Sequence, residues 1–370
     1  MKLLIATDNY PPRYDGISRF LQETIPALKE HHDIHVIAPN YGPSQELAPT
    51  TKIPIKKLKI GDYHPPKLKP LLIYKHVKQA DAVFIQSLGS IGLLALLAAR
   101  IQKKKTVLFT HAIEWELVPK STHAKTLHRL LPRVLKTIDR TLYKWIDLLI
   151  MPADNVSELY YWNRIDNKRV IVQLGVDKKR FKKPANKQQA KQEAGLDPEA
   201  YIIGYHGRLA REKDLKTLLR AYLRFKRTNP ETNTHLLIVG DGLPEIRDLL
   251  DRPGVTVAGF VQDPAPLLQA MDVYVMPSTT ETTCLSVVEA MSSELPVIST
   301  PVGFVRDYIT HEKNGFFFEE KNDYALTKKL EELQDEQQRK KVGRQARKDI
   351  TKQFSWDKTR QQLIDIFNNL

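Results

Sequence analysis

The chain has 370 residues, of which 42% are hydrophobic and 27% are charged, and this composition excludes a chain that is disordered throughout. The length exceeds what one ordinary hydrophobic core supports and predicts two domains of roughly 150–200 residues each. The single cysteine, Cys284, excludes an intrachain disulfide and favours a reducing compartment.

The net charge of +14 is unevenly distributed along the chain. Residues 51–150 contain 19 Lys and Arg against 6 Asp and Glu, whereas residues 251–300 contain 1 Arg against 6 acidic residues. This asymmetry indicates an anionic partner for the first of these stretches. The longest apolar run, residues 91–101, is shorter than the roughly 20 residues of a membrane span, and residues 1–12 lack the features of a signal peptide. We therefore expect a soluble or peripheral protein.

Strands and helices are predicted to alternate along the chain in two series. In the first series, strands are predicted at residues 2–7, 33–39, 81–87 and 106–111, and helices at residues 17–30 and 90–102. In the second series, strands are predicted at residues 201–207, 234–242, 255–260, 272–278 and 295–300, and helices at residues 214–227, 243–251, 264–271 and 285–293. A polar segment at residues 175–195 separates the two series, and residues 354–370 have the period of a final amphipathic helix.

This alternation predicts an α/β fold with two doubly wound, Rossmann-like domains that face a cleft. We place the first domain at residues 1–175 and the second at residues 176–353, and we expect the helix at residues 354–370 to pack back on the first domain. In open parallel sheets, ligands bind beyond the carboxyl ends of the strands. The loops that follow the strands are therefore the candidate sites.

The loop after the strand at residues 201–207 combines glycine with two cations. Arg208 and Lys213 follow Gly207, and a helix is predicted to begin directly afterwards. A guanidinium binds two oxygens at once and an ammonium acts as a point charge, so this pair suits a diphosphate. The alternative is a solvated loop that is basic because the whole chain is rich in Lys and Arg.

Two glutamates, Glu281 and Glu289, lie on either side of the start of the helix predicted at residues 285–293. The N–H groups at the start of a helix favour an anion, whereas a carboxylate accepts hydrogen bonds from hydroxyl groups. Together they suit a ligand that carries both phosphates and hydroxyls. The alternative is a capping acid, Glu281, and an ordinary helix acid, Glu289.

Two loops of the first domain carry weaker signals. Gly16 lies in a turn-rich loop where a ligand can approach the backbone closely, although a tight strand-to-helix turn is the simpler explanation. His111 ends a strand, where it can act as an acid, a base or a hydrogen-bond donor, or have a structural role. The motifs HExxH, CxxC, GxSxG and GxxxxGK[ST] are absent, so we predict neither a structural zinc site nor a nucleoside triphosphatase.

Five segments of the chain carry a resemblance to one family when they are taken in this order. They are GVDKKRF, GRLAREKD, IVGDG, MDVYVMPS and ETTCLSVVEAM. Together they are similar to the GT-B retaining glycosyltransferases, specifically glycosyltransferase family 4, whose E-x7-E motif the last segment matches. The resemblance covers nearly the whole chain. It implies the GT-B fold, with an N-terminal acceptor-binding domain and a C-terminal domain that binds a nucleotide sugar.

The resemblance implies a role for each candidate residue. Arg208 and Lys213, beside Gly207, would hold the donor diphosphate, and the backbone N–H groups of Leu285 and Ser286 would face the phosphates. Glu289 would bind the ribose hydroxyls, and Glu281 would contact the donor sugar. In the first domain, Gly16 would line the cleft and His111 would lie near the reacting carbons. Of these, the catalytic set would be Arg208, Lys213, Glu281 and His111.

The implied reaction is transfer of a hexose from a UDP- or GDP-linked sugar with retention at the anomeric carbon. The resemblance implies no cofactor and no divalent metal, because the two cations and the helix start stabilise the charge of the leaving group. The chain departs from the family pattern at residues 282–284 (TTC), where Gly-Phe-Gly is common, and at residues 15–18 (DGIS), where a diglycine is common.

The basic residues of the first domain bear on the acceptor. Basic amphipathic stretches such as residues 124–150 lie on anionic membranes, and the resemblance extends to glycolipid synthases and phosphatidylinositol mannosyltransferases. We therefore predict a lipid acceptor on the inner, cytoplasmic face of a membrane, contacted by Arg129, Arg133, Lys136 and Arg140. The alternatives are an internal helix with a solvated basic face, a soluble sugar or sugar-phosphate acceptor, and a nucleic-acid binder without catalysis, against which the donor motifs argue.

Overall fold

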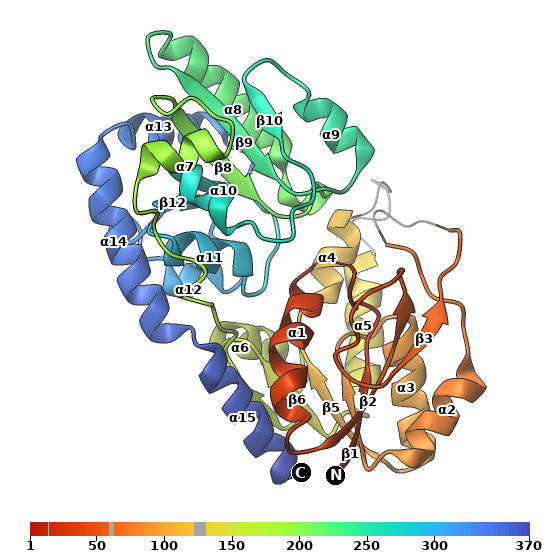
Figure 1. The fold of residues 1–370 in the computed structure, drawn as a ribbon. Helices are drawn as coiled ribbons and strands as arrows, with labels where there is room; N and C mark the ends of the chain where they lie inside the picture. The colour runs from red at the N-terminus through yellow and green to blue at the C-terminus, as the bar shows by residue number, and fades with distance from the viewer. Residues whose placement is uncertain (14, 59–62, 122–130) are drawn as a thin grey trace. The chain divides into compact units, whose positions relative to one another are not determined.

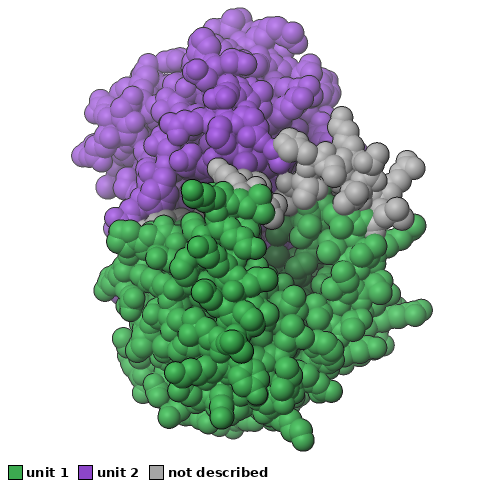
Figure 2. Space-filling model, turned by 90° about the vertical axis from the view of Figure 1, so that its right-hand side faces the viewer, with its two compact units in different colours: residues 1–175, 356–370 green, residues 176–355 purple. Residues whose placement is uncertain are grey.

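The computed structural model describes residues 1–13, 15–58, 63–121 and 131–370 (Figure 1). The chain forms two compact units. Unit 1 comprises Met1–Gly175 and Trp356–Leu370, and unit 2 comprises Val176–Ser355 (Figure 2). The chain therefore leaves unit 1 after Gly175 and returns to it at Trp356.

Unit 1 is built on a parallel sheet of seven strands within the described residues, in the order β3-β2-β1-β4-β5-β6-β7 (Figure 1). The strands are β1 (Lys2–Ala6), β2 (Asp33–Asn40), β3 (Thr50–Pro54), β4 (Ala82–Ile85), β5 (Lys105–Phe109), β6 (Leu148–Met151) and β7 (Arg169–Ile171). The helices are α1 (Gly16–Leu28), α2 (Pro70–Gln79), α3 (Ser90–Ile101), α4 (Glu114–Ser121), α5 (Leu131–Tyr143), α6 (Asp154–Trp162) and α15 (Trp356–Asn368). The strand order reverses between β1 and β4, which makes the sheet doubly wound.

Unit 2 repeats this plan with a parallel sheet of six strands in the order β10-β9-β8-β11-β12-β13. The strands are β8 (Tyr201–His206), β9 (Thr234–Val239), β10 (Val255–Val257), β11 (Val273–Met276), β12 (Val297–Ser299) and β13 (Phe316–Phe317). The helices are α7 (Lys187–Glu193), α8 (Leu215–Thr228), α9 (Pro244–Leu250), α10 (Ala265–Ala270), α11 (Leu285–Ser292), α12 (Val305–Tyr308), α13 (Asp323–Glu332) and α14 (Glu336–Gln353), and a 3-10 turn covers Arg211–Lys213. The order reverses between β8 and β11. The predicted α/β fold with two doubly wound, Rossmann-like domains is confirmed.

The last helix, α15, belongs to unit 1 and packs against α1. The ring of Phe367 lies 5.0 Å from that of Phe84, measured between centroids, in an edge-on arrangement. The Thr359 hydroxyl donates a hydrogen bond of 2.6 Å to the backbone oxygen of Gln173. An aromatic contact with the sheet and a hydrogen bond from a side chain to the backbone thus hold α15 on unit 1.

A cluster of buried polar groups joins α4, α5 and α6 in unit 1. Atom Oε2 of Glu114 accepts hydrogen bonds from the hydroxyls of Tyr143 and Tyr160 at 3.4 and 3.3 Å. Burial and the neighbouring carboxyl of Asp139 raise the pKa of Glu114 to about 8, and burial raises the pKa of Asp139 to about 6. The carboxyl of Glu114 therefore carries a proton at neutral pH in most molecules.

This cluster predicts a pH dependence of stability. The folded chain retains a proton on Glu114 that the unfolded chain releases above about pH 4.5, so the free energy of unfolding should fall as the pH rises from about 4.5 to about 8. Glu114→Gln keeps an acceptor oxygen but cannot ionise, and it should raise stability near pH 8 by about 2 kcal/mol while removing most of the slope. Urea unfolding of the full chain across this range measures the effect.

Glu336→Gln is the matched control for this experiment, because Glu336 lies exposed on α14 in the other unit. It should follow the pH profile of the wild type. A Glu114→Gln chain whose unfolding midpoint keeps the wild-type pH slope would show that Glu114 is ionised in the folded protein.

Candidate functional site

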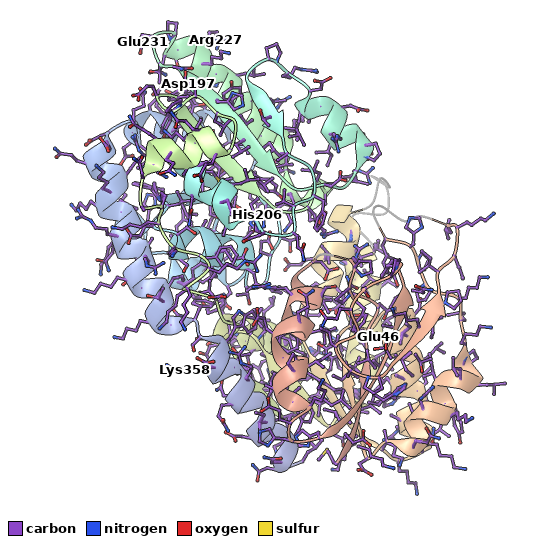
Figure 3. All side chains as sticks on the ribbon, in the orientation of Figure 1. Glu46, Asp197, His206, Arg227, Glu231 and Lys358 are labelled. Carbon is purple, nitrogen blue, oxygen red and sulfur yellow. The ribbon has the colours of Figure 1, made fainter. Side chains whose placement is uncertain are left out.

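The candidate site of unit 2 lies where two loops leave neighbouring strands. β8 and β11 pair in parallel, so the loops at residues 207–214 and 277–284 begin at the same edge of the sheet. This edge lies at the point where the strand order reverses, which is the usual ligand position in such sheets. His206, labelled in Figure 3, is the last residue of β8 and marks the place.

Glycine is required at position 207 by its surroundings. Its φ is +151°, and a Cβ atom there would lie 2.7 Å from the hydroxyl oxygen of Tyr205. That hydroxyl is committed, because it donates a hydrogen bond of 2.7 Å to the backbone oxygen of Arg208. The buried Tyr205 thus fixes the path of the chain from β8 into the loop that carries both predicted cations.

Glu212 holds the two loops together, and the sequence did not single it out. Its side chain is 4% exposed, and its Oε1 atom accepts a hydrogen bond of 2.8 Å from Nη2 of Arg208. Its backbone oxygen accepts hydrogen bonds from the N–H group and the hydroxyl of Thr279, at 2.7 and 3.2 Å. Glu212 therefore orients Arg208 and also fastens the loop after β11.

Lys213 forms an ion pair with Glu281. Its Nζ atom contacts Oε1 of Glu281, and the hydroxyl of Ser278 donates a hydrogen bond of 2.7 Å to the same oxygen. The two charged side chains are 14% and 10% exposed. Burial disfavours the charge on Lys213, but the nearby groups, with Glu281 foremost, outweigh it and hold the pKa of Lys213 above its ordinary value. The ammonium is therefore charged at neutral pH.

Glu289 lies on α11 and faces His206. Oε2 of Glu289 is 3.6 Å from Nδ1 of His206. Burial, together with the charges of Arg180 and Lys213, lowers the pKa of His206 to about 4. The imidazole is neutral at pH 7, so this contact is not an ion pair and does not neutralise the carboxylate of Glu289.

The start of α11 is braced from the far side by the segment at residues 303–308. The hydroxyl of Tyr308 donates a hydrogen bond of 2.8 Å to the backbone oxygen of Thr283. A Cβ atom on Gly303 would lie 2.1 Å from the backbone oxygen of Glu281, so only glycine fits there.

Cys284 stands at the N-cap of α11 with φ of +56°, and burial raises the pKa of its thiol to about 12. The predicted phosphate-facing N–H groups, those of Leu285 and Ser286, belong to the first turn of this helix, where no carbonyl within the helix accepts from them.

The two predicted residues of the first domain lie in unit 1. Gly16 is the first residue of α1, and open space surrounds the position of a Cβ atom built on it. His111 follows β5, where its ring stacks on Phe109 and its Nε2 atom lies 2.9 Å from Oε1 of Gln86. Burial lowers the pKa of His111 to about 3, so its imidazole is neutral at pH 7. The structure thus brings the other predicted site residues together in unit 2.

The predicted membrane-facing residues that the structure describes differ in exposure. Arg129 lies outside the described residues, and Arg133 is exposed. Lys136 lies over the ring of Trp115 at 5.7 Å, and Nε of Arg140 donates a hydrogen bond of 2.7 Å to the backbone oxygen of Asn163. Lys136 and Arg140 are thus half-buried on α5, which buries Asp139 and Tyr143, and a contact of these basic residues with a membrane stays a prediction.

None of the helices in the described ranges combines the length and the apolar character of a membrane span. Within the same ranges, no group of three or more His, Cys, Asp and Glu side chains is arranged to hold a metal ion.

Two family models match the chain in succession. One, described as "Glycosyltransferase Family 4", matches residues 14–180, and the other, "Glycosyl transferases group 1", matches residues 186–349. The alpha-monoglucosyldiacylglycerol synthase of Acholeplasma laidlawii is 26% identical over 351 residues, which cover 86% of this chain and 85% of that protein. A GDP-mannose-dependent alpha-mannosyltransferase of Corynebacterium glutamicum is 26% identical over 347 residues, 86% of this chain and 77% of that protein.

Solved structures show the same fold. The Anabaena protein HepE, in complex with UDP, matches with a TM-score of 0.78 over 100% of both chains at 18% sequence identity. The chain belongs to glycosyltransferase family 4, and its two parallel-sheet units are those of a GT-B glycosyltransferase.

Proposed function

We propose that the protein transfers a hexose from a nucleotide-diphosphate sugar to a membrane lipid, with retention at the anomeric carbon and without a metal ion. This proposal rests on one observation: two cations, two carboxylates that can accept hydrogen bonds and the start of a helix meet at one edge of the sheet of unit 2. Cations and helix N–H groups suit a diphosphate, and carboxylates suit the hydroxyls of ribose and hexose.

The cations and α11 stabilise the departing nucleoside diphosphate in this proposal. Arg208 is oriented by Glu212, so its planar guanidinium is held in place before the donor arrives. The ammonium of Lys213 is positively charged at neutral pH, and the first N–H groups of α11 form the positive end of a helix dipole. Donors held in place in this way stabilise a developing charge without reorganising, which is the work that a metal does in other transferases.

The carboxylates bind the hydroxyl groups. Glu289 accepts hydrogen bonds from the ribose, and its contact with His206 is not an ion pair, because that imidazole is neutral. Glu281 accepts from the donor sugar. His111 contributes a hydrogen bond rather than a charge, because its imidazole is neutral over the physiological range.

A lipid acceptor is supported by unit 1 and by a relative. Residues 51–150 carry the excess of cations, and large apolar side chains of this stretch are exposed, with Leu71 at 84%, Val134 at 52% and Ile138 at 46%. Basic side chains and exposed apolar side chains in the same stretch of the chain suit an anionic membrane. The name of the Acholeplasma relative refers to a glucosylated diacylglycerol, and both relatives are named for hexosyl groups.

Glu289→Gln should weaken the binding of a nucleoside diphosphate by roughly 10–100-fold, because a hydrogen bond from the ribose to a charged group contributes about 1.5–3 kcal/mol. Binding of glucose 1-phosphate, which lacks the ribose, should change little. Calorimetric titration with UDP and with GDP measures the change, and Glu336→Gln serves as the control. If the variant binds the nucleotide as tightly as the wild type does, Glu289 is not the ribose ligand.

Lys213→Ala should raise the activation free energy by about 2–4 kcal/mol and so lower turnover, as the loss of one preorganised hydrogen-bond donor does. Donor hydrolysis or transfer assayed with a panel of UDP- and GDP-sugars gives the rate. EDTA should leave the wild-type rate unchanged in the same assay. A rate that EDTA abolishes and manganese restores would contradict the metal-free mechanism.

Membrane binding is tested on the exposed side of α5. Arg133→Glu combined with Ile138→Asp should reduce sedimentation with phosphatidylglycerol vesicles and leave donor hydrolysis unchanged, because neither side chain is among those assigned to the donor. Wild-type binding should fall as salt rises, since the screening length is about 10 Å at 0.1 M salt. Lys136 and Arg140 are left intact because their contacts with Trp115 and Asn163 serve the fold.

The control for vesicle binding is Lys340→Glu, a charge reversal at an exposed position of unit 2. It should bind vesicles as the wild type does. A wild type that never binds anionic vesicles but glycosylates a water-soluble sugar or sugar phosphate would establish the soluble acceptor instead.

A further inference from the structure

In the candidate site, each of the two cations that would bind a diphosphate is paired with a carboxylate. Arg208 is paired with Glu212, and Lys213 is paired with Glu281. Glu289 adds a further negative charge beside His206, which is neutral. A diphosphate that approaches these groups therefore meets two cations that are each already paired with a carboxylate.

The two ion pairs differ in how readily they can separate. Glu212 is buried, and its backbone is fastened by Thr279, so it stays with Arg208 as a fixed support. A guanidinium has a planar array of five N–H donors and can serve a support and a ligand through different edges. Lys213 instead presents one compact charge, and Glu281 and a phosphate oxygen compete for it directly.

Glu281 is also the residue that the proposed function assigns to the donor sugar. Its Oε1 atom accepts from both Lys213 and Ser278, so one of its two oxygens is engaged within the protein. Sugar hydroxyls offer the carboxylate new hydrogen bonds that compensate it for the loss of the lysine. A nucleoside diphosphate without the sugar offers no such compensation.

We propose that Glu281 discriminates between donor and product by exchanging partners. When the intact nucleotide sugar is bound, Glu281 separates from Lys213 and binds the sugar hydroxyls, and Lys213 pairs with the diphosphate. After the hexose has been transferred, Glu281 has lost the sugar and returns to Lys213, which weakens the hold on the nucleoside diphosphate and speeds its release. This inference rests on the proposed function and adds to it a specificity role for Glu281, namely that it opposes the binding of the product.

The test is to compare how Glu281→Gln changes affinity for the two ligands. The amide keeps the size of the side chain and can accept hydrogen bonds, but it does not attract the ammonium. We expect UDP or GDP to bind about tenfold more tightly to Glu281→Gln than to the wild type, which is about 1.4 kcal/mol. The matching nucleotide sugar, UDP-glucose or GDP-mannose, should bind equally or more weakly. Calorimetric titration of the full chain gives the dissociation constants.

Steady-state kinetics provide a second measurement on the same variants. Product inhibition by the nucleoside diphosphate should become about tenfold stronger in Glu281→Gln, while its kcat falls. Glu281→Asp keeps the charge on a side chain shorter by one methylene, and its affinity for the product should lie between those of the wild type and Glu281→Gln. Glu336→Gln, exposed on α14, should match the wild type in every assay.

The outcomes separate this inference from the function on which it rests. If the wild type binds neither nucleoside diphosphate nor nucleotide sugar, the proposed function fails. If the wild type binds them but Glu281→Gln and Glu281→Asp bind the product no more tightly, the proposed function stands and the exchange of partners is wrong. Equal tightening for product and nucleotide sugar would likewise overturn it, because Glu281 would then not distinguish the two.

Discussion

The link that Glu212 makes between two loops is the interaction on which the candidate site depends. β8 and β11 are neighbours, so the loops that follow them leave the same edge of the sheet, but nothing in the sheet itself sets their separation. The backbone oxygen of Glu212 sets it by accepting two hydrogen bonds from Thr279. Because Glu281 follows Thr279 by two residues, this link also determines where the carboxylate meets Lys213.

Burial explains why carboxylates accompany the cations of a site that is expected to bind an anion. A charge removed from water is costly unless an opposite charge is close to it, and Lys213 is largely removed from water. Glu281 and Glu212 keep its ammonium charged, as the raised pKa of Lys213 shows. The same attraction reduces what the cation can offer to a ligand. A buried cation of this kind is therefore stable and well placed, but it is not fully available until its carboxylate finds another partner.

The sequence predicted the fold well because most strands are short apolar runs followed by a segment of helical period. It missed short or edge elements such as β3 (Thr50–Pro54) and β13 (Phe316–Phe317), which lack a long apolar run. It selected the residues that unit 2 brings together, because Glu281 and Glu289 lie eight residues apart and flank the start of one helix. It did not select Glu212, whose role depends on a contact with Thr279, 67 residues further along the chain.

The basic stretch at residues 124–150 shows the same limit of a local pattern. Its periodicity left open whether the helix is internal or lies on a membrane, and the folded chain buries Asp139 and exposes Val134 and Ile138. Burial raises the pKa of Asp139 to about 6 and that of Glu114 to about 8, so at pH 7 Glu114 is mostly protonated whereas Asp139 is mostly ionised. Loss of the charge on Glu114 makes the stretch at residues 51–150 more positive than its 19 basic and 6 acidic residues indicate. The exposed apolar side chains lie in that same stretch, and this combination supports an anionic lipid surface as its partner.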